Sequence, residues 1–457
     1  MNSGSIKSKT RTAQRGAVVL RGTLRRSLVL GVVASCLWSS TTCMAADWLQ
    51  FRGSAGDGES RVTDLPTAWT STEHVAWRCE LPGEGWSSPV VVGDRILLSA
   101  AIPVASTRPV GDAEGDGTKD APSLSGEDLE LALLIVDGRS GRLLKRVALF
   151  TEIAATAPKI HSKNSHASPT PIVSGDRVYL HFGHLGTACT SVEGEVLWKN
   201  DHLVYKPVHG NGGSPVLVGQ SLIFTQDGGE QGKVIALDAQ TGKTRWEVVR
   251  DVEASKKFSF STPLVLDVAG KTQVIVPGSN IVQSLDPETG QEIWRVRYEG
   301  YSVIPRPIVA AGLVLVSTSY DRPTLLAIRP DGQGDVTDTH VAWQTNVAVP
   351  HTPSLNAHAD LVFMVSDKGI VTCLEAETGK EVWKERIGGN FSASPLLAGD
   401  ELYLLSEEGD TTVVKADREY QEVSRNKLGE RTLASMAVID HDLLIRSAQA
   451  LYRITKQ

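Results

Sequence analysis

A short proline-containing segment recurs along this chain and constrains its fold more than any other feature. Seven copies hold the proline and an eighth lacks only that residue: Ser87–Pro89, Ala167–Pro169, Gly213–Pro215, Ser261–Pro263, Pro305–Pro307, His351–Pro353, Ala393–Pro395 and Leu433–Ser435. After Pro169 the consecutive prolines are 46, 48, 44, 46 and 42 residues apart. A period of this length with strand-forming sequence inside it is typical of a propeller blade.

Each repeat contains the same order of strand and turn signals. The proline opens a short apolar strand such as Pro89–Val92, a turn follows at Gly93–Arg95, and a second apolar strand begins at Ile96. A third strand such as Val234–Leu237 precedes a fourth strand that carries a tryptophan, as at Trp246. Short β-rich runs bounded by Gly, Asp and Asn predict strands and hairpins, and four strands make one blade.

The turn between the third and fourth strands carries the most specific motif, Leu-Asp-x-x-Thr-Gly-x-x-x-Trp. It occurs at Leu237–Trp246 and Leu285–Trp294, and at Leu374–Trp383 with glutamate in place of aspartate. The acidic residue, such as Asp238, caps the turn, and Gly242 supplies the positive φ. Because tryptophan offers a large apolar face and one N–H donor, we expect it to dock one blade onto the next.

The repeat count predicts a ring that the N-terminal region closes. The last unit ends at a third strand, Leu451–Ile454, and the missing fourth strand with its tryptophan is present at Val75–Leu81. Two blades lack the fourth-strand tryptophan, near Lys145 and Val423. The sequence therefore predicts an all-β, eight-bladed β-propeller over residues 47–457, with its last blade closed by an N-terminal strand and no long unpaired edge.

The first 46 residues differ from the rest of the chain. They contain seven Lys and Arg and no acidic residue, followed by the apolar run Leu28–Trp38. This pattern predicts a signal peptide over residues 1–46, cleaved after Ala45 or Ala46, and hence a secreted protein in the periplasm or outside the cell. A lipoprotein site at Val33–Cys36 and a retained anchor remain alternatives. No later segment is long and apolar enough for a membrane helix.

Charge and cysteine content exclude some classes of function. Without the seven N-terminal basic residues, the 53 acidic residues outweigh the basic ones by more than the −7 of the whole sequence. This balance argues against a nucleic-acid partner held by general electrostatics. Cys79, Cys189 and Cys373 fall on different blades, so we expect three free, buried thiols rather than a disulfide. Residues 103–130, small and acidic, predict a mobile surface insertion in the first blade.

The Leu-Asp-x-x-Thr-Gly-x-x-x-Trp repeat resembles the tryptophan-docking motif of the pyrroloquinoline quinone (PQQ) propeller superfamily. The stretch Trp48–Gly58 resembles the start of exported PQQ-like repeat proteins of the planctomycete type. Asn164–Pro169 and Gly429–Ser435 resemble further motifs of the same group. The resemblance covers nearly all of residues 47–457 and implies the eight-bladed ring.

For function the resemblance implies two alternatives. Quinoprotein alcohol dehydrogenases share the ring and carry a vicinal disulfide against the quinone, a catalytic Asp and calcium-binding acidic residues. This chain has no adjacent cysteines, and none of its residues matches that Asp or those calcium ligands. The outer-membrane assembly lipoprotein BamB shares the ring, has no catalysis and binds a partner protein through loops. This chain is nearer to BamB in size.

A propeller places any site in the funnel where the loops before the first strands meet the turns between second and third strands. Concave sites with aromatic walls and few polar groups commonly bind ligands, and arginines there favour an anion. The candidates that we predict for a ligand-binding funnel are Trp86, Asn164, His166, His209, Asn211, Phe260, Arg306, Tyr320, Arg322, His351, Phe391 and Arg431.

Six of the eleven histidines fall between residues 161 and 209. His161, His166, His181 and His184 are weak candidates for metal ligands, since their spacing matches no known metal motif. The acidic turn residues Glu407, Glu408 and Asp410 offer oxygen ligands for calcium, and a solvated turn is the simpler interpretation.

The sequence predicts no catalytic residue. It favours an exported, non-catalytic binding scaffold whose propeller face takes a protein or a small anionic ligand. A PQQ-dependent oxidoreductase, with PQQ and calcium as cofactors, is the alternative.

Overall fold

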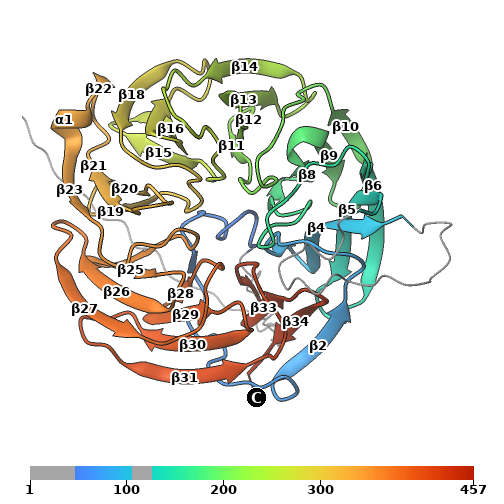
Figure 1. Ribbon diagram of the computed structural model, residues 1–457. Helices are drawn as coiled ribbons and strands as arrows, with labels where there is room; N and C mark the ends of the chain where they lie inside the picture. Colours follow the sequence, from blue (N-terminus) through green and yellow to red (C-terminus); the bar gives the residue numbers. More distant parts are fainter. Residues whose placement is uncertain (1–46, 105–125, 457) are drawn as a thin grey trace, which may run out of the picture. The chain divides into compact units, whose positions relative to one another are not determined.

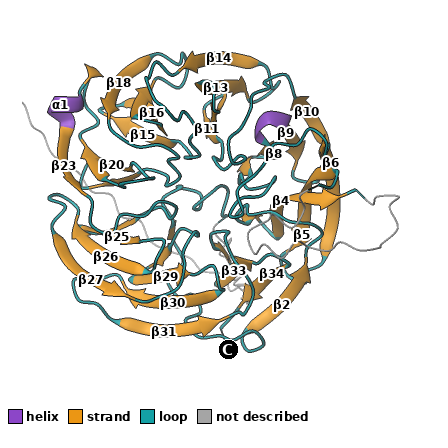
Figure 2. Cartoon of the chain, in the orientation of Figure 1, coloured by secondary structure: helices purple, strands orange, loops and turns teal. Residues whose placement is uncertain are grey.

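The computed structural model describes residues 47–104 and 126–456, and these residues form an all-β ring of eight blades (Figure 1). Each blade is an antiparallel sheet whose first strand lies nearest the centre and whose fourth strand lies at the outside. Among the described residues the helices are two short turns, η1 (Gly183–Leu185) and α1 (Thr337–His340) (Figure 2). The predicted fold class is confirmed.

Four strands that pair in sequence order make up each of the first seven blades. Blade 1 contains β3 (Val90–Val92), β4 (Arg95–Pro103), β5 (Leu129–Asp137) and β6 (Leu143–Glu152), and blade 2 contains β7 (Ile172–Ser174), β8 (Arg177–His181), β9 (Thr187–Ser191) and β10 (Val196–Asn200). Blade 3 contains β11 (Val216–Val218), β12 (Ser221–Asp227), β13 (Gly232–Asp238) and β14 (Thr244–Val249), and blade 4 contains β15 (Leu264–Val268), β16 (Lys271–Gly278), β17 (Ile281–Leu285) and β18 (Glu292–Arg297).

The remaining blades follow the same plan, with two short additions. Blade 5 contains β19 (Ile308–Ala310), β20 (Leu313–Ser317), β21 (Leu325–Ile328) and β23 (Val341–Thr345), and blade 6 contains β24 (Asn356–His358), β25 (Leu361–Val365), β26 (Ile370–Glu375) and β27 (Glu381–Arg386). Blade 7 contains β28 (Leu396–Ala398), β29 (Glu401–Leu405), β30 (Asp410–Lys415) and β31 (Glu422–Lys427), and blade 8 contains β32 (Ala437–Ile439), β33 (Asp442–Arg446), β34 (Ala450–Ile454) and β2 (Val75–Glu80). β22 (Gly334–Asp335) pairs with β18, and β1 (Glu59–Ser60) pairs with β28, both in parallel.

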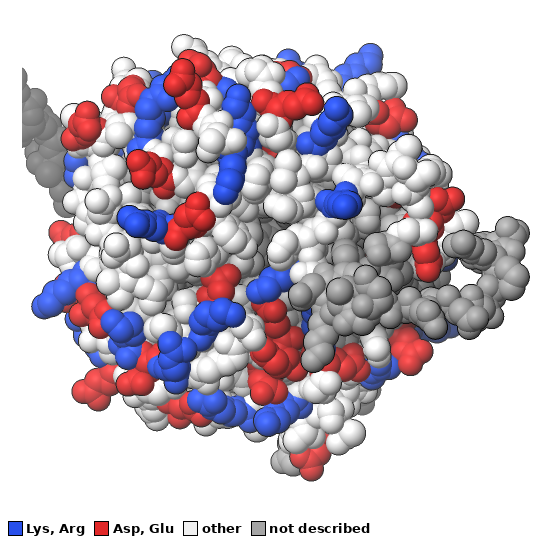
Figure 3. Space-filling view, in the orientation of Figure 1, with Lys and Arg blue, Asp and Glu red and all other residues white. Residues whose placement is uncertain are grey.

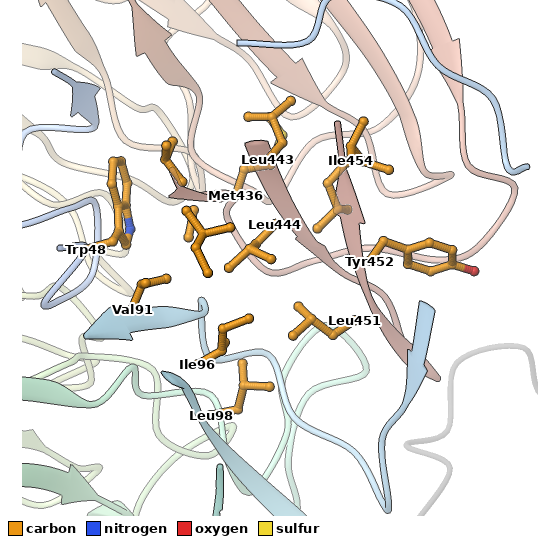
Figure 4. Packing of buried hydrophobic residues seen from close by; sticks show 14 of the residues in the cluster. Trp48, Val91, Ile96, Leu98, Met436, Leu443, Leu444, Leu451, Tyr452 and Ile454 are labelled. Atoms are coloured by element: carbon orange, nitrogen blue, oxygen red, sulfur yellow. The ribbon is translucent and has the colours of Figure 1, made fainter. Parts of the chain in front are cut away.

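The N-terminal strand closes the ring as the repeat count predicts. β2 pairs antiparallel with β34, and Cys79 lies opposite Leu451. Apolar side chains of blades 1 and 8 then share one core, in which Leu444 and Leu451 face Ile96 (Figure 4). Closure therefore satisfies the backbone groups of β34 and buries a continuous apolar seam.

The tryptophans dock the blades as predicted. Trp246 Nε1 donates to Pro287 O of the next blade at 3.0 Å, and its indole covers Gly290, where an added Cβ would lie 2.8 Å from the ring. Trp77 makes the same contact from the last blade to the first, donating to Gly138 O at 3.0 Å. The same indole N–H bond to a backbone carbonyl of the following blade is made by Trp77, Trp198, Trp246, Trp294, Trp343 and Trp383.

The two blades without a fourth-strand tryptophan use other contacts. Lys145 Nζ donates to Glu193 O at 2.8 Å and to Gly194 O at 3.2 Å, so a lysine bridges blades 1 and 2. Beside blade 7 the chain before β2 supplies a tryptophan instead. Trp69 is 4% exposed in the shared core, and its backbone N–H donates to Asn426 Oδ1 at 2.9 Å.

The three cysteines behave as the sequence predicts. Cys79, Cys189 and Cys373 are free and buried on blades 8, 2 and 6. Burial raises the pKa of Cys189 to about 11 and that of Cys373 to about 12, so both thiols stay protonated and unreactive at neutral pH.

Two predictions lie wholly or partly outside the described residues. The proposed signal peptide, residues 1–46, is outside them, as are residues 105–125 of the proposed insertion. The described flanks of that insertion are strand ends, since Pro103 of β4 pairs with Leu129 of β5. Within the described ranges, no helix has the length and apolar character needed to cross a membrane.

Charges of both signs are interspersed over the face displayed in Figure 3.

Candidate functional site: the central funnel

A ring of hydroxyl groups surrounds the channel where each blade's innermost strand begins. Six of these hydroxyl oxygens accept the backbone N–H of the equivalent residue in the preceding blade, at 2.9–3.0 Å. We call this set the hydroxyl annulus; its seven members are Ser88, Thr170, Ser214, Thr262, Ser354, Ser394 and Ser435. The eighth position is Arg306, whose N–H donates to Ser354 Oγ at 2.9 Å.

The annulus corrects the register of the sequence repeat in two blades. The prolines had aligned Ser168 and Thr352 with the other blades. In the structure Thr170 and Ser354, each two residues further along, make the inter-blade hydrogen bonds. A second proline at Pro171 follows Thr170, so the proline pattern alone could not choose between the two registers.

Residues Trp48–Ser60, which we call the crossing segment, run through the centre of the ring (Figure 1). Trp48 pairs with Val91 of blade 1 through bonds of 3.0 and 2.8 Å. Further along the crossing segment, Gly58 O accepts Leu397 N of blade 7 at 2.8 Å. The crossing segment thus closes one end of the channel.

Two buried arginines fix the crossing segment. Arg306 is 2% exposed and donates from Nη1 to Phe51 O at 3.0 Å and from Nε to Pro263 O at 3.1 Å. Arg52, also 2% exposed, donates to Leu355 O of blade 6 at 2.5 Å. Burial lowers the pKa of Arg52 to about 9 and that of Arg306 to about 10, so both stay charged at neutral pH.

These contacts explain the glycines of the motif Trp48–Gly58. A Cβ at Gly56 would lie 2.2 Å from Arg306 Nη1, and one at Gly58 would lie 2.4 Å from Arg52 Nη2. Both glycines also have a positive φ. Only glycine allows the two guanidinium groups to pass this close to the backbone.

Above the crossing segment lies a cavity of about 590 Å³. Phe51 of the crossing segment and all seven annulus residues line it. Its walls and rim add aromatic rings and two lysines, and no Asp or Glu is among the lining residues. The other side chains used below are Trp86, His161, Lys163, Asn164, His209, Lys256, Phe258, Phe260, Tyr301 and Tyr320.

Aromatic side chains form a continuous arc along one side of the mouth. Centroid separations between successive rings are 5.7 Å for His161–His209, 5.3 Å for His209–Phe258, 5.7 Å for Phe258–Tyr301, 6.2 Å for Tyr301–Tyr320 and 5.1 Å for Tyr320–His351. We call these six residues the aromatic arc. Successive rings at such distances support one another and present a wide apolar surface.

Charged groups at the mouth are mostly held by partners. Lys163 Nζ lies 2.6 Å from Glu407 Oε1, which also accepts from Ser392 Oγ at 2.6 Å. Lys256 differs: its Nζ donates to Tyr301 Oη at 2.6 Å, and that hydroxyl in turn donates to Asp321 Oδ1 at 3.1 Å. The bond to Tyr301 raises the pKa of Lys256, which keeps this amine charged.

A second groove, of about 790 Å³, opens between blades 4 and 5 beside the cavity. Tyr301 and Tyr320 line both spaces, and Arg322 and Arg297 line the groove only. The stacked tyrosines therefore separate the central cavity from a channel that leads outward.

The structure divides the twelve predicted funnel residues. Five line the cavity: Trp86, Asn164, His209, Phe260 and Tyr320. Arg322 lines the neighbouring groove, His351 ends the aromatic arc, and Arg431 lies over the Trp86 ring at 5.7 Å.

The other four predicted residues serve the protein's own packing. Arg306 holds the crossing segment, and Phe391 is 2% exposed in the core between blades 6 and 7. Asn211 accepts from Tyr205 Oη. His166 faces Glu152, with Nδ1 to Oε2 at 3.7 Å. The loops around 164–166 and 209–211 each contribute one cavity-lining residue, Asn164 or His209, and one that packs against the protein itself, His166 or Asn211. Sequence position alone does not distinguish the two kinds.

The histidines do not gather into one site. His161 lies in the cavity, and His181 is buried against Phe224 with its Nδ1 2.9 Å from Thr187 Oγ1. His184 Nε2 makes an ion-pair contact of 2.8 Å with Glu152, without aligned hydrogen-bond geometry. Burial opposes ionisation of Glu152, but His166 and His184 outweigh it and lower the pKa of Glu152 to about 2.

The cavity does not fit a calcium–quinone pair. Calcium takes six to eight oxygen ligands in which carboxylates dominate, and the cavity lining offers hydroxyl oxygens without a carboxylate. Glu407 is bound by Lys163, and Glu408 accepts from Asn390 Nδ2 at 2.7 Å. Asp410 opens β30 and pairs with Lys427. Within residues 47–104 and 126–456, no three His, Cys, Asp or Glu are arranged to hold a metal ion.

Sequence reasoning missed several residues of this site. The hydroxyl annulus corresponds in part to the Ser or Thr before most repeat prolines, a pattern that indicates the number of blades but not a site. Phe258 and Tyr301 lie two or more residues before the predicted loop positions. Phe51 reaches the cavity from a segment more than 200 residues away from most of the walls, so no local signal could have placed it.

Comparisons with known proteins agree with this architecture. Among solved structures, BamB from Moraxella catarrhalis is 15% identical, covers 79% of this chain and 98% of its own, and has a TM-score of 0.51. A europium-containing methanol dehydrogenase is 12% identical, covers 89% of this chain and 90% of its own, and has a TM-score of 0.56. At such identities both likenesses show the fold alone.

Curated relatives are more similar in sequence but match only in part. The outer membrane protein assembly factor BamB of Yersinia pestis is 25% identical over 42% of this chain and 51% of its own length. That of Shewanella oneidensis is 26% identical over 45% and 56%. The chain thus spans about half the length of the curated relatives it matches.

The profile of one protein family matches three overlapping stretches, residues 132–256, 231–333 and 333–445. Together they run from β5 of blade 1 to β33 of blade 8, which is more than half of the chain. The repeating strands and docking tryptophans described above agree with matches that recur along the chain. The chain therefore belongs to the family described as "Outer membrane protein assembly factor BamB".

Proposed function

We propose that this chain is an exported, non-catalytic propeller scaffold that binds a partner protein through the mouth of its central funnel. Family membership and the basic, then apolar, N-terminal sequence support export and a role in the cell envelope. The similar BamB proteins are named as outer membrane protein assembly factors. We therefore propose that this chain, too, binds a protein during such assembly.

The aromatic arc is the observation that carries the proposal. Rigid aromatic rings contribute large contact areas at low entropic cost and dominate protein–protein interfaces. Tyr320 is 36% exposed at the junction of the cavity and the groove, and it packs only against Tyr301 and His351 among the described rings. An arc of this kind at the rim of a cavity that is closed at one end is suited to holding a side chain or chain end of a partner.

The charged groups at the mouth support a binding role over turnover. Lys163 is paired with Glu407, and His351 Nδ1 lies 3.3 Å from Asp367, whose Oδ1 also accepts from Thr352 Oγ1 at 2.8 Å. These bonds tie neighbouring loops together. They hold the shape of the mouth and leave the ionised groups committed to structural partners.

Affinity capture from envelope extracts tests the proposal when it compares variants. A chain carrying Tyr301→Ala and Tyr320→Ala should lose a protein that the unaltered chain retains. The matched control is Tyr420→Ala, a tyrosine on the outer side of blade 7 that packs against Trp383. Equal capture by all three chains would place the partner surface elsewhere on the propeller.

A spectral titration with PQQ and calcium, followed by an assay of dye-linked alcohol oxidation, tests the oxidoreductase alternative. The scaffold proposal expects no oxidation. Saturable quinone binding together with turnover would contradict it.

A further inference from the structure

The hydroxyl annulus contains hydrogen-bond donors that the protein itself does not use. Thr170, Ser214, Thr262, Ser354, Ser394 and Ser435 each accept one backbone N–H, so the hydroxyl proton of each remains available. None of the six donates to another described group. All of them line one cavity, so their hydroxyl groups border a common space.

Ser88, the seventh member, is an independent sign of a ligand. Its side chain is 1% exposed, it lines the cavity, and its Oγ has no hydrogen-bond partner among the described residues. A buried polar group without a partner costs free energy. This serine therefore gains most from a ligand that accepts a hydrogen bond at the base of the funnel.

The charges and walls of the cavity narrow the chemistry of that ligand. Unused hydroxyl donors, with no carboxylate in the lining, favour an acceptor-rich anion over a neutral sugar, whose own hydroxyls would also need acceptors. Lys256 at the rim adds a positive charge whose link to a carboxylate, Asp321, runs through the Tyr301 hydroxyl. Phe51, Phe258 and Phe260 give the space between the annulus and the rim flat apolar walls.

We propose that this cavity binds a carboxylate attached to a flat apolar group, with the carboxylate held by the hydroxyl annulus. The volume of about 590 Å³ is within the range of small-molecule sites and exceeds what a lone ion needs. The carboxylate can belong to the C-terminal residue of a partner chain or to a free small acid. The first source rests on the proposed scaffold function; the second does not.

Calorimetric titration of the purified chain with four probes tests this inference. The probes are 3-phenylpropionate, its amide, a Gly-Ser peptide ending in phenylalanine with a free carboxylate, and the same peptide with an amidated end. Both acids should bind, and each should bind at least about tenfold more tightly than its amide, the effect of losing a charged hydrogen-bond partner. Tighter binding by the peptide acid identifies a chain terminus as the source; tighter binding by phenylpropionate identifies a small acid.

Two serines provide a matched pair of variants. Ser88→Ala removes an annulus hydroxyl that holds no described partner, so the fold should be unaffected while the affinity for both acids falls by about tenfold. Ser221→Ala removes another buried serine whose Oγ is equally without a partner but which does not line the cavity. This control should bind like the unaltered chain.

Three results would overturn the inference: no binding of either acid, equal affinity for acid and amide, or equal effects of the two serine variants. The scaffold proposal has its own readout, because partner capture is scored with the tyrosine variants. Capture that survives Ser88→Ala while both acids fail to bind would leave the scaffold standing and remove the carboxylate site.

Discussion

The two ends of the central channel are built from the same eight blades but use their polar groups differently. At the closed end, Arg52 and Arg306 are buried and donate to backbone carbonyls, and glycines at 56 and 58 make room for them. At the open end, the annulus hydroxyls keep their protons, Ser88 has no described partner, and Tyr320 is 36% exposed. Arg52 Nε and Nη1 also lack a described partner, but Arg52 is buried and does not line the cavity, so this end is structural. An end whose unused donors and exposed rings border the cavity is suited to binding.

The largest effect is expected from removing the closed end together with the closing strand. Deletion of residues 47–82 removes the crossing segment and β2, which leaves the outer edge of β34 unpaired. Exposed strand edges template aggregation, so the truncated chain should aggregate or lose cooperative unfolding. Truncation after Ala46 is the control and should melt normally. A monomeric deletion protein with unchanged melting, by light scattering and calorimetry, would disprove closure by the N-terminus.

Replacing an aromatic residue between two docked blades should lower the free energy of unfolding more than replacing one at the mouth. Trp294 is fully buried and donates to Gln273 Oε1 and Pro330 O, both at 3.0 Å. Trp294→Ala should lower the free energy of unfolding by about 3–5 kcal/mol. Tyr320→Ala, at the mouth, should cost less than about 1 kcal/mol. Denaturant melts of both variants check this contrast, and similar losses would mean that the mouth is part of the folding core.

The close approach of arginine and glycine at the closed end can be measured separately from backbone strain. Gly58→Ala places a Cβ 2.4 Å from Arg52 Nη2 at a φ of +81°. Gly312 also has a positive φ, +73°, but an added Cβ there meets nothing within 4 Å. Gly312→Ala should cost about 1 kcal/mol for strain alone, and Gly58→Ala about 2–3 kcal/mol. Equal losses in urea melts would show that the arginine contact is unimportant.

Acid should destabilise the ring through the buried His181. Burial, with a smaller effect of His184, lowers the pKa of His181 to about 3. The folded chain keeps this imidazole neutral, while the unfolded chain takes up a proton below its ordinary pKa. The stabilising contribution is therefore complete above about pH 6.5 and is lost as the pH falls toward 3.

His181→Gln, which cannot take up that proton, should flatten the fall in unfolding free energy between pH 6.5 and 5. The slope should decrease by up to about 1.4 kcal/mol per pH unit. The matched control is the same substitution at an exposed histidine, His202→Gln. An unchanged slope for His181→Gln would show that its burial does not govern the acid response.

The parts of this molecule that repeat could be predicted from sequence, and the parts that do not repeat could not. The Trp-docking turns and the strand at Val75–Glu80 follow from a local period, so the ring and its closure were accessible. Arg306 occupies the annulus position at which the other blades carry Ser or Thr, yet its guanidinium turns to the closed end, where Phe51 O accepts its hydrogen bond. That partner comes from a crossing segment whose path no periodicity describes.

Contacts between distant segments also explain why only part of the predicted cavity lining is found in the structure. Trp86, Asn164, His209, Phe260 and Tyr320 line the cavity as candidates chosen by loop position. Which neighbouring loop residue turns inward depends on contacts between blades. The register of the annulus in blades 2 and 6 likewise depends on inter-blade hydrogen bonds, which the proline pattern does not encode.

Site-specific photocrosslinking compares the two ends of the channel within one blade. A photoreactive phenylalanine at Tyr320, 36% exposed at the mouth, is matched by one at Val309, 38% exposed in β19 near the other end of the same hairpin. In cells that produce the protein, the account predicts a crosslinked partner from position 320 and none from position 309. A partner trapped from position 309, with none from 320, would contradict the assignment of binding to the open end.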